Sequence, residues 1–226
     1  MIEENVKKLL QEIPQTNKFG EKVTLVAAVK LQTPESINRA IAAGITDIGD
    51  NHVQEFKEKY DFIEGEPVRH FIGHLQTNKV KYLIGKTDLY HSVDRLNLAE
   101  EISKRSFNAG ITSNVLIQIN IGNEESKGGF AVEQAEESVK SISAFPSLKI
   151  KGLMAMLPDT DDESELKRLA CIMREKFDAL KKEYADFEYL SMGMSGDWKI
   201  CLDCGSNMIR LGTAIFGKRV SSPLNQ

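Results

Sequence analysis

The chain has 226 residues, of which 41% are hydrophobic and 27% charged. This composition is typical of globular proteins and argues against the disordered, collagen-like and coiled-coil classes. With 29 Lys and Arg against 33 Asp and Glu, the formal net charge is −4, which gives no electrostatic reason to expect nucleic acid or an anionic membrane as a partner.

The N-terminus and the cysteines indicate the compartment. Glu3 and Glu4 stand where a secretory signal peptide needs basic residues, and no apolar run approaches the roughly 20 residues that cross a bilayer. The three cysteines are odd in number and sparse, which argues against a secreted disulfide framework; they are Cys171, Cys201 and Cys204. We therefore expect a soluble, cytoplasmic protein with reduced thiols.

Apolar runs rich in β-branched residues recur along the whole chain, and a stretch with helical spacing follows each of them. This alternation is typical of parallel sheets. An extra helix at about 2–13 precedes the first strand. We predict eight strands, at about 23–29, 46–49, 68–72, 88–93, 114–121, 149–154, 188–192 and 207–211.

The helices between these strands carry start and stop signals. After the first strand, Thr33 can cap a helix, Pro34 suits its first position and Gly44 suits its exit. Asp94 is expected to cap the helix that carries Leu98. Another helix, at about 162–184, is expected to lie on the sheet because its apolar residues recur every three or four positions; they are Leu166, Leu169, Met173, Phe177, Leu180 and Tyr184.

Eight strands in alternation with helices suit a closed (β/α)8 TIM-type barrel with an extra N-terminal helix, and an open doubly wound sheet is the alternative. No Pro/Gly/Ser-rich linker, low-complexity tract or internal repeat divides the chain, so we expect one domain over residues 1–226. In a barrel the functional groups lie at the carboxyl ends of the strands.

Lys30 follows the first strand directly, at the mouth of the predicted barrel. A partly buried lysine favours its neutral amine, the form that attacks a carbonyl, so this is a suitable place for a Schiff-base lysine. The alternative is a lysine that leaves the core and extends its charged end to water.

Small, donor-rich turns follow the last two strands, at 191–197 and 210–214. Backbone N–H groups freed by glycine, together with Ser and Thr hydroxyls, make an anion site, and barrels often bind phosphate after strands seven and eight. Each turn alone is consistent with a tight connection. Their coincidence opposite Lys30 favours a phosphate-bearing aldehyde as ligand.

Other polar residues are less specific. Groups at 51–52, 73–79 and 91–94 gather at the same rim, but His70 and His91 are flanked by strand residues and are expected to be core histidines. The Cys201-x-x-Cys204 pair lacks the two further ligands that a structural zinc site needs, so we interpret these cysteines as structural thiols and expect no metal.

A series of motifs, taken in order and spacing, closely resembles the YggS/PROSC family of pyridoxal 5'-phosphate (PLP) homeostasis proteins. The resemblance covers about residues 23 to 219. The motifs are LVAAVK at 25–30, DNHVQE at 50–55, HFIGHLQTNK at 70–79, HSVDR at 91–95, SKGGF at 126–130, GLM at 152–154, LSMGMS at 190–195 and RLGTAIFG at 210–217.

The resemblance implies a fold similar to the barrel domain of alanine racemase, with PLP as cofactor in a Schiff base on Lys30. It further implies that Arg210 faces the pyridine nitrogen and that Asn51 neighbours the ring, with Met194 and His74 as further pocket candidates. The implied phosphate ligands are Ser195, Gly212 and Thr213.

Arg210 bears on the chemistry, because an always-charged guanidinium beside the ring nitrogen disfavours its protonation and makes PLP a poorer electron sink. That suits exchange of one amine for another on PLP more than general carbanion chemistry. Modest departures from the usual family pattern are Val29, Asp50 and Arg69, and the cysteines at 201 and 204.

Three functions compete. The favoured one is a non-catalytic protein that carries or buffers PLP and maintains vitamin B6 and amino-acid balance. The second is a single-domain amino-acid racemase, against which stands the absence, before the chain ends at Gln226, of the β domain that supplies a second base in racemases of this fold. The third is a sugar-phosphate-binding barrel without a Schiff base.

The expected partners are PLP and, in exchange reactions, amino acids or PLP-accepting apo-enzymes. We expect no nucleic acid and no membrane as partners. No apolar surface stripe in the sequence demands a second copy, so a monomer is expected, with a dimer left open.

Overall fold

Parallel pairing between the first and the last strand closes the sheet of this protein. The computed structural model describes residues 1–124 and 127–217, so Ser126 of the SKGGF motif and the chain end at Gln226 lie outside the described residues. Within these ranges all eight predicted strands are present: β1 Thr24–Ala28, β2 Asp47–Asp50, β3 Val68–Phe71, β4 Leu89–Val93, β5 Ser113–Ile119, β6 Leu148–Ala155, β7 Tyr189–Ser191 and β8 Met208–Leu211.

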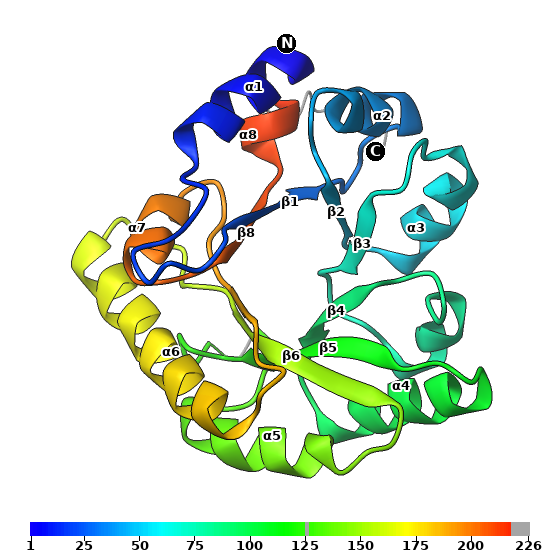
Figure 1. The fold of residues 1–226 in the computed structure, drawn as a ribbon, viewed down its shortest axis with the longest axis vertical. Helices are drawn as coiled ribbons and strands as arrows, with labels where there is room; N and C mark the ends of the chain where they lie inside the picture. Colours follow the sequence, from blue (N-terminus) through cyan, green and yellow to red (C-terminus); the bar gives the residue numbers. More distant parts are fainter. Residues whose placement is uncertain (125–126, 218–226) are drawn as a thin grey trace, which may run out of the picture.

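The strands follow one another around the barrel in chain order, and every neighbouring pair is parallel. β1 and β8 pair from Thr24 opposite Met208 to Ala27 opposite Leu211. This closure confirms the predicted TIM-type barrel and contradicts the open doubly wound alternative. Figure 1 shows the ring of strands with the helices around it.

The connections differ in length and type. Most are α-helices, but β3 leads to β4 through the 3-10 helix η2 (Thr77–Tyr82). None of the helices in the described ranges is both long and apolar enough to span a bilayer. The α-helices are α1 Ile2–Glu12, α2 Pro34–Ala42, α3 Val53–Lys59, α4 Leu96–Asn108, α5 Ala135–Ser143, α6 Glu163–Glu183, α7 Trp198–Asp203 and α8 Thr213–Phe216.

Local sequence signals explain where several helices begin and end. The Thr33 hydroxyl accepts the Ser36 N–H at the start of α2, Pro34 occupies the first turn, and Gly44 follows the helix at a φ of 118°. Asp162 accepts two backbone N–H groups at the start of α6. The apolar stripe of α6 is buried from Leu166 to Leu180, as the spacing predicts.

The core has an outer and an inner part. Most apolar side chains pack between the strands and the surrounding helices in two clusters. A third, smaller cluster lies in the barrel interior and is formed by residues from five different strands; its buried members are Val26, Leu89, Leu116, Met154 and Met208. The interior is therefore a packed core rather than a channel.

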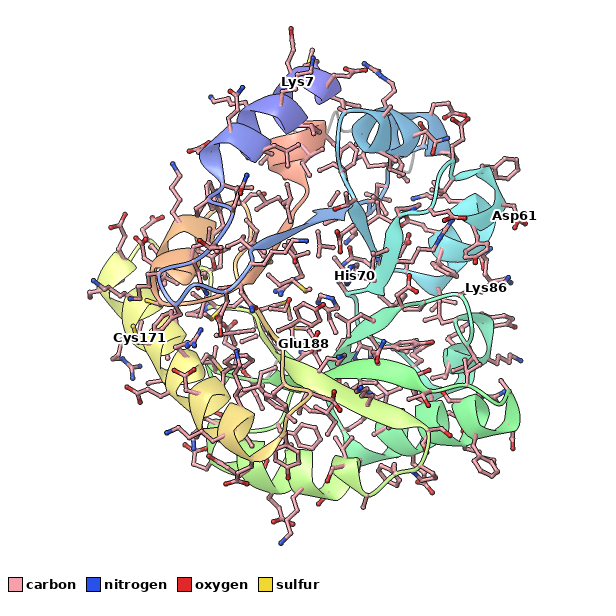
Figure 2. All side chains as sticks on the ribbon, viewed as in Figure 1. Lys7, Asp61, His70, Lys86, Cys171 and Glu188 are labelled. Carbon is pink, nitrogen blue, oxygen red and sulfur yellow. The ribbon has the colours of Figure 1, made fainter. Side chains whose placement is uncertain are left out.

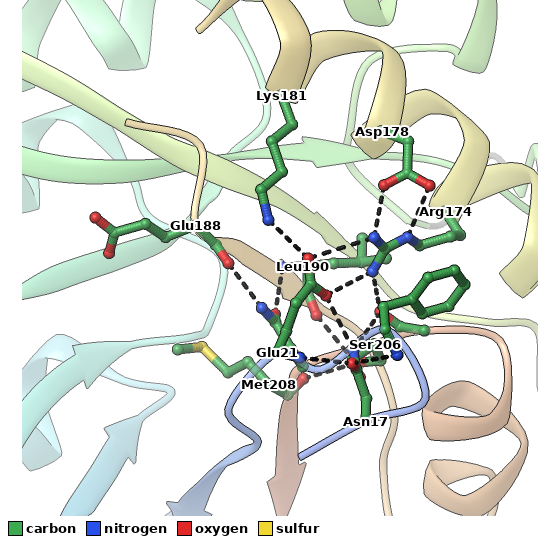
Figure 3. Close-up of polar contacts among 12 residues, drawn as sticks. Asn17, Glu21, Arg174, Asp178, Lys181, Glu188, Leu190, Ser206 and Met208 are labelled. Atoms are coloured by element: carbon green, nitrogen blue, oxygen red, sulfur yellow. Dashed lines mark hydrogen bonds and ion pairs between the residues drawn. The ribbon is translucent and has the colours of Figure 1, made fainter. Parts of the chain in front are cut away.

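A polar cluster ties the loop before β1 to α6 and to the turn before β8 (Figure 3). Glu21 accepts hydrogen bonds from Arg174, Lys181 and Asn17, and Arg174 also donates to the Gly205 carbonyl. Burial raises the pKa of Glu21, but the hydrogen bonds from Arg174, Lys181 and Asn17 outweigh it and bring the pKa down to about 2. The cluster therefore stabilises the pairing of β1 with β8 at the end where both strands begin.

Glu21→Gln is expected to lower the free energy of unfolding at pH 7 by about 1–2 kcal/mol, since it removes one of the two carboxylates that pair with Arg174, and the carboxylate that pairs with Lys181, in a site that is only partly exposed. A carboxylate with a lowered folded-state pKa stabilises the fold above its unfolded value of 4.5. The difference from wild type should therefore disappear as the pH falls from 4.5 to about 2.

Urea titrations at pH 7 and at pH 3 measure this difference. The matched control is Glu183→Gln, because Glu183 is exposed at the end of α6, the helix that carries Arg174 and Lys181. Equal losses for both variants at pH 7 would show that the cluster contributes nothing beyond an ordinary surface charge.

Candidate functional site

A pocket of about 420 Å³ opens where the ends of β1 and β2 meet the turns after β7 and β8. It brings together all seven residues that the sequence selects as a cofactor site, Lys30, Asn51, Met194, Ser195, Arg210, Gly212 and Thr213. The remaining described lining residues are Ala28, Gln32, Gly196, Phe216 and Gly217. That these residues bind a cofactor stays a prediction.

Lys30 lies two residues beyond β1 and is half-buried. Its amine makes no hydrogen bond or ion pair with any described residue. The next residue, Leu31, has a φ of 61°, a left-handed conformation that costs a non-glycine residue roughly 1–2 kcal/mol. The turn that presents Lys30 to the pocket is thus strained and needs support.

Glu55 of α3 supplies that support. Its Oε2 accepts the Leu31 N–H at 2.7 Å and a hydrogen bond from Lys59 at 2.7 Å, while the Lys59 amine also donates to the Val29 carbonyl at 3.3 Å. Burial raises the pKa of Glu55, but the hydrogen bonds from Lys59 and Leu31 lower it overall. The backbone on both sides of Lys30 is therefore held by one carboxylate–lysine pair.

The two turns across the pocket carry unused hydrogen-bond donors. The backbone N–H groups of Ser195, Gly196 and Thr213 make no hydrogen bond to any described residue. Asp197 accepts the Met194 N–H at 2.6 Å and closes the first turn. Such free N–H groups, with the Ser195 and Thr213 hydroxyls beside them, form a cradle of the kind that binds phosphate.

Gly193 explains the tight course of the first turn. Its φ is 114°, and a Cβ there would lie 3.0 Å from the Trp198 Cα. A side chain at this position would push α7 away from the end of β7.

Arg210 is 5% exposed and forms the floor of the pocket. It donates from Nη1 to the Ser191 hydroxyl at 2.6 Å and from Nη2 to the Ala155 carbonyl at 3.0 Å. Burial lowers its pKa to about 10, so the guanidinium remains charged near neutral pH. Among the twelve described lining residues, Lys30 and Arg210 alone have ionisable side chains. The pocket therefore suits an anionic ligand.

A profile of the family described as "Alanine racemase, N-terminal domain" matches residues 2–220. The chain belongs to this family.

Curated relatives of this family member carry a more specific name. A pyridoxal phosphate homeostasis protein of Aquifex aeolicus is 42% identical over 197 residues, which cover 86% of each chain. One of Pasteurella multocida is 36% identical over 227 residues, which cover 96% of this chain and 97% of that protein. The resemblance to PLP homeostasis proteins that the motifs indicate is thus confirmed.

Solved structures agree. PipY of Synechococcus elongatus is 28% identical and superimposes with a TM-score of 0.88 in its structure without PLP and 0.82 in the one with PLP bound; both matches cover 96% of this chain and all of PipY. Alanine racemase of Clostridium difficile matches with a TM-score of 0.78 at 13% identity over 98% of this chain and 57% of its own. The second likeness concerns the fold alone, and it confirms the expected racemase-type barrel.

Elsewhere in this family member, the structure contradicts the expected helix cap at Asp94 and places His74 outside the pocket lining. Asp94 does not cap α4, because its carboxylate is engaged by the Arg95 guanidinium and, at 3.2 Å, by His74 Nδ1, and Arg95 occupies the cap position. His74, whose side chain is 65% exposed, makes this contact instead of lining the pocket. Both His70 and His91 are buried, so the prediction of core histidines is confirmed.

The cysteines do not act as one pair. Cys201 and Cys204 are both buried, and the Cys204 sulfur accepts a hydrogen bond from Cys171 of α6 at 3.1 Å. In residues 1–124 and 127–217, no group of three or more His, Cys, Asp and Glu side chains is placed to hold a metal ion.

Asp50, the residue before Asn51, carries a buried carboxyl group. Burial raises its pKa to about 6, although the charges of Lys59 and Arg69 act in the opposite direction. The sequence pattern gives Asp50 and Glu55 no role, since the positions that bury and pair them come from β2 and α3 packing together. The signal available was their presence in the DNHVQE motif.

Glu55→Ala is expected to lower the free energy of unfolding by about 2 kcal/mol, because the Leu31 N–H loses its acceptor and the Lys59 amine loses its carboxylate partner. Chemical denaturation measures the loss. Glu58→Ala on the exposed side of the same helix is the control and should cost at most a few tenths of a kcal/mol. A loss no larger than that of the control would mean that Glu55 does not support the Lys30 turn.

Asp50→Asn is expected to stabilise the protein at pH 8 by roughly 2 kcal/mol. A carboxyl group whose folded-state pKa is raised from 3.8 to about 6 contributes its full stability below pH 3.8 and loses it as the pH rises through 6. The advantage of the variant should therefore shrink between pH 7 and pH 4. Unfolding free energies over this range test the expectation, with the exposed Asp61→Asn as control; a pH-independent difference contradicts it.

Proposed function

We propose that the pocket binds PLP through a Schiff base on Lys30 and that the whole chain, residues 1–226, acts as one PLP-binding domain. In this proposal the protein carries or buffers the cofactor without catalysing a reaction, and so helps to maintain vitamin B6 and amino-acid balance. The names of the relatives and the PLP bound to PipY support the choice of cofactor.

The residues present fit the group. An unpaired amine stands on one side of the pocket and three free backbone N–H groups stand on the other, in a volume of about 420 Å³. PLP supplies an aldehyde that amines capture and a conjugated ring that withdraws electrons. Lys30 would hold the aldehyde end, and Ser195, Gly212 and Thr213 would hold the phosphate.

Arg210, Asn51 and Met194 would contact the ring. A guanidinium charged at neutral pH keeps a proton off the ring nitrogen, which leaves the ring a weak electron sink. Transfer of the cofactor between amines does not need a strong sink, so this arrangement suits a carrier, although racemases of this fold tolerate it too.

The observation that carries the non-catalytic reading is the set of ionisable groups in the pocket. Two-base racemisation needs a proton donor or acceptor on each face of the substrate carbon. Of the described lining residues, only Lys30 and Arg210 have ionisable side chains, and Arg210 stays charged near neutral pH, so no second proton-exchanging group stands beside Lys30. This favours the carrier over the racemase. The sugar-phosphate alternative leaves the unpaired Lys30 amine without a role.

The protein is further proposed to act in the cytoplasm as a monomer. Amino acids and apo-enzymes would be the partners that exchange amines with the bound cofactor. Size-exclusion chromatography with light scattering measures the oligomeric state.

Lys30→Ala is expected to abolish the visible absorption band that wild type shows with PLP, and to weaken PLP binding at least about tenfold, because the covalent link is lost. Borohydride should remove the wild-type band and leave PLP attached to Lys30 by mass spectrometry. The control is Lys81→Ala, an exposed lysine outside the pocket that should leave the band intact.

Absence of a band in wild type with added PLP would sink the cofactor proposal. The same preparations are assayed for racemisation of alanine. Turnover that depends on Lys30 would favour the enzyme over the carrier.

A further inference from the structure

A continuous chain of polar side chains runs through the barrel interior. It begins at Asp47 on β2, whose Oδ1 lies 2.9 Å from His70 Nε2, and continues from His70 Nδ1 to His91 Nε2 at 2.9 Å. His91 Nδ1 lies 3.0 Å from the Ser191 hydroxyl, which accepts a hydrogen bond from Arg210 at 2.6 Å. Figure 2 shows His70 on the inner side of the strand ring, whereas Lys7 and Asp61 lie on the periphery.

The chain crosses the barrel from one side to the other. β4 pairs with β3 and β5, and β7 pairs with β6 and β8, so the contact between His91 and Ser191 joins strands that are not neighbours. His70, His91 and Ser191 are each at most 2% exposed. Asp47 lies at the opposite mouth from the pocket, where it lines a second cavity together with His70.

The two ends of the chain fix the direction of every hydrogen bond. A guanidinium only donates, so the Ser191 oxygen accepts from Arg210 and its own hydrogen goes to His91 Nδ1. His91 must then carry its proton on Nε2 and donate it to His70 Nδ1. His70 in turn donates from Nε2 to the Asp47 carboxylate.

The reverse arrangement fails at both ends. It would point a histidine lone pair at the Asp47 carboxylate and would leave the Ser191 hydrogen without its histidine acceptor. The chain therefore forms one row of aligned dipoles with acceptors toward Arg210 and donors toward Asp47. Such a row stabilises a buried cation that has no carboxylate in direct contact.

Protonation of His91 would disrupt this row. Burial, the largest cause, together with neighbouring His70 and the charge of Arg210, lowers the pKa of His91 well below its ordinary value. His91 thus stays a neutral acceptor for Ser191 at physiological pH.

We propose that Ser191, His91 and His70 are positioning residues for Arg210, holding its guanidinium charged and aimed into the pocket by linking it to the Asp47 carboxylate across the barrel. For the cofactor this rests on the proposed binding of PLP. The tautomers of the two histidines follow from the hydrogen bonds between Asp47 and Arg210 and do not depend on the cofactor.

The first measurement is nitrogen-15 NMR of the histidine side chains in the wild-type protein without added cofactor. Neutral His70 and His91 should both be protonated on Nε2. His91 protonated on Nδ1, or doubly protonated at pH 7, overturns the proposal. This readout does not depend on PLP. It therefore distinguishes failure of the proposed hydrogen-bond chain from Asp47 to Arg210 from failure of the proposed function.

The second measurement compares Ser191→Ala with Ser206→Ala in the PLP-loaded protein. Both hydroxyls are fully buried, but Ser206 donates to backbone carbonyls and does not contact Arg210. Ser191→Ala should shift the midpoint of the pH titration of the bound cofactor's absorbance by about one unit and weaken PLP binding about tenfold.

Ser206→Ala should lower thermal stability without moving the midpoint of the absorbance titration. Ser191→Thr, which keeps the hydroxyl, should give the same midpoint as wild type. Asp47→Asn should shift the titration in the same direction as Ser191→Ala by a smaller amount. An unchanged titration in Ser191→Ala, or equal shifts in the Ser191→Ala and Ser206→Ala variants, overturns the role of the chain.

Discussion

The positive charge of Arg210, held inside the barrel, is the constraint on which the site depends. Moving a guanidinium out of water is costly unless its donors find acceptors. Here two donors meet the Ser191 hydroxyl and the Ala155 carbonyl, and no described carboxylate contacts the group. The interior must therefore supply negative potential by other means, and the aligned side chains from Asp47 to Ser191 do so. The barrel interior consequently contains an apolar cluster around Met154 and Met208 and a polar series of side chains beside it.

Closure of the sheet determines which groups meet around that charge. Because β1 pairs with β8, Lys30 from the start of the chain faces Arg210 and Thr213 from its end. The left-handed Leu31 and the contact from Glu55 fix the course of the backbone that presents Lys30 to the pocket. The cluster around Glu21 braces the same pair of strands from the opposite mouth (Figure 3). Distant parts of the molecule thus serve one pocket of few ionisable groups.

Much of this arrangement can be predicted from the sequence. The eight strands follow from the period of the apolar runs, and Lys30 follows from its place at a strand end, whereas Arg210 is singled out by the family resemblance. Asp94 could not be predicted, because the choice of its carboxylate between the α4 backbone and the Arg95 and His74 side chains depends on how the loop after β3 packs. The link between His91 and Ser191 could not be predicted either, since it requires the register of strands on opposite sides of a closed barrel.

The dependence on the last strand has a consequence during synthesis. Lys30 leaves the exit tunnel of the ribosome long before the residues of β8 are made. For most of translation, the turns after β7 and β8 are therefore not yet in place opposite its amine. Contacts between segments this far apart in sequence form late and slowly. Under the proposed function, a growing chain would therefore expose a lysine that captures aldehydes weakly and without selection. Selective capture would begin only when the finished barrel closes, which would make occupancy of the pocket a property of completed molecules.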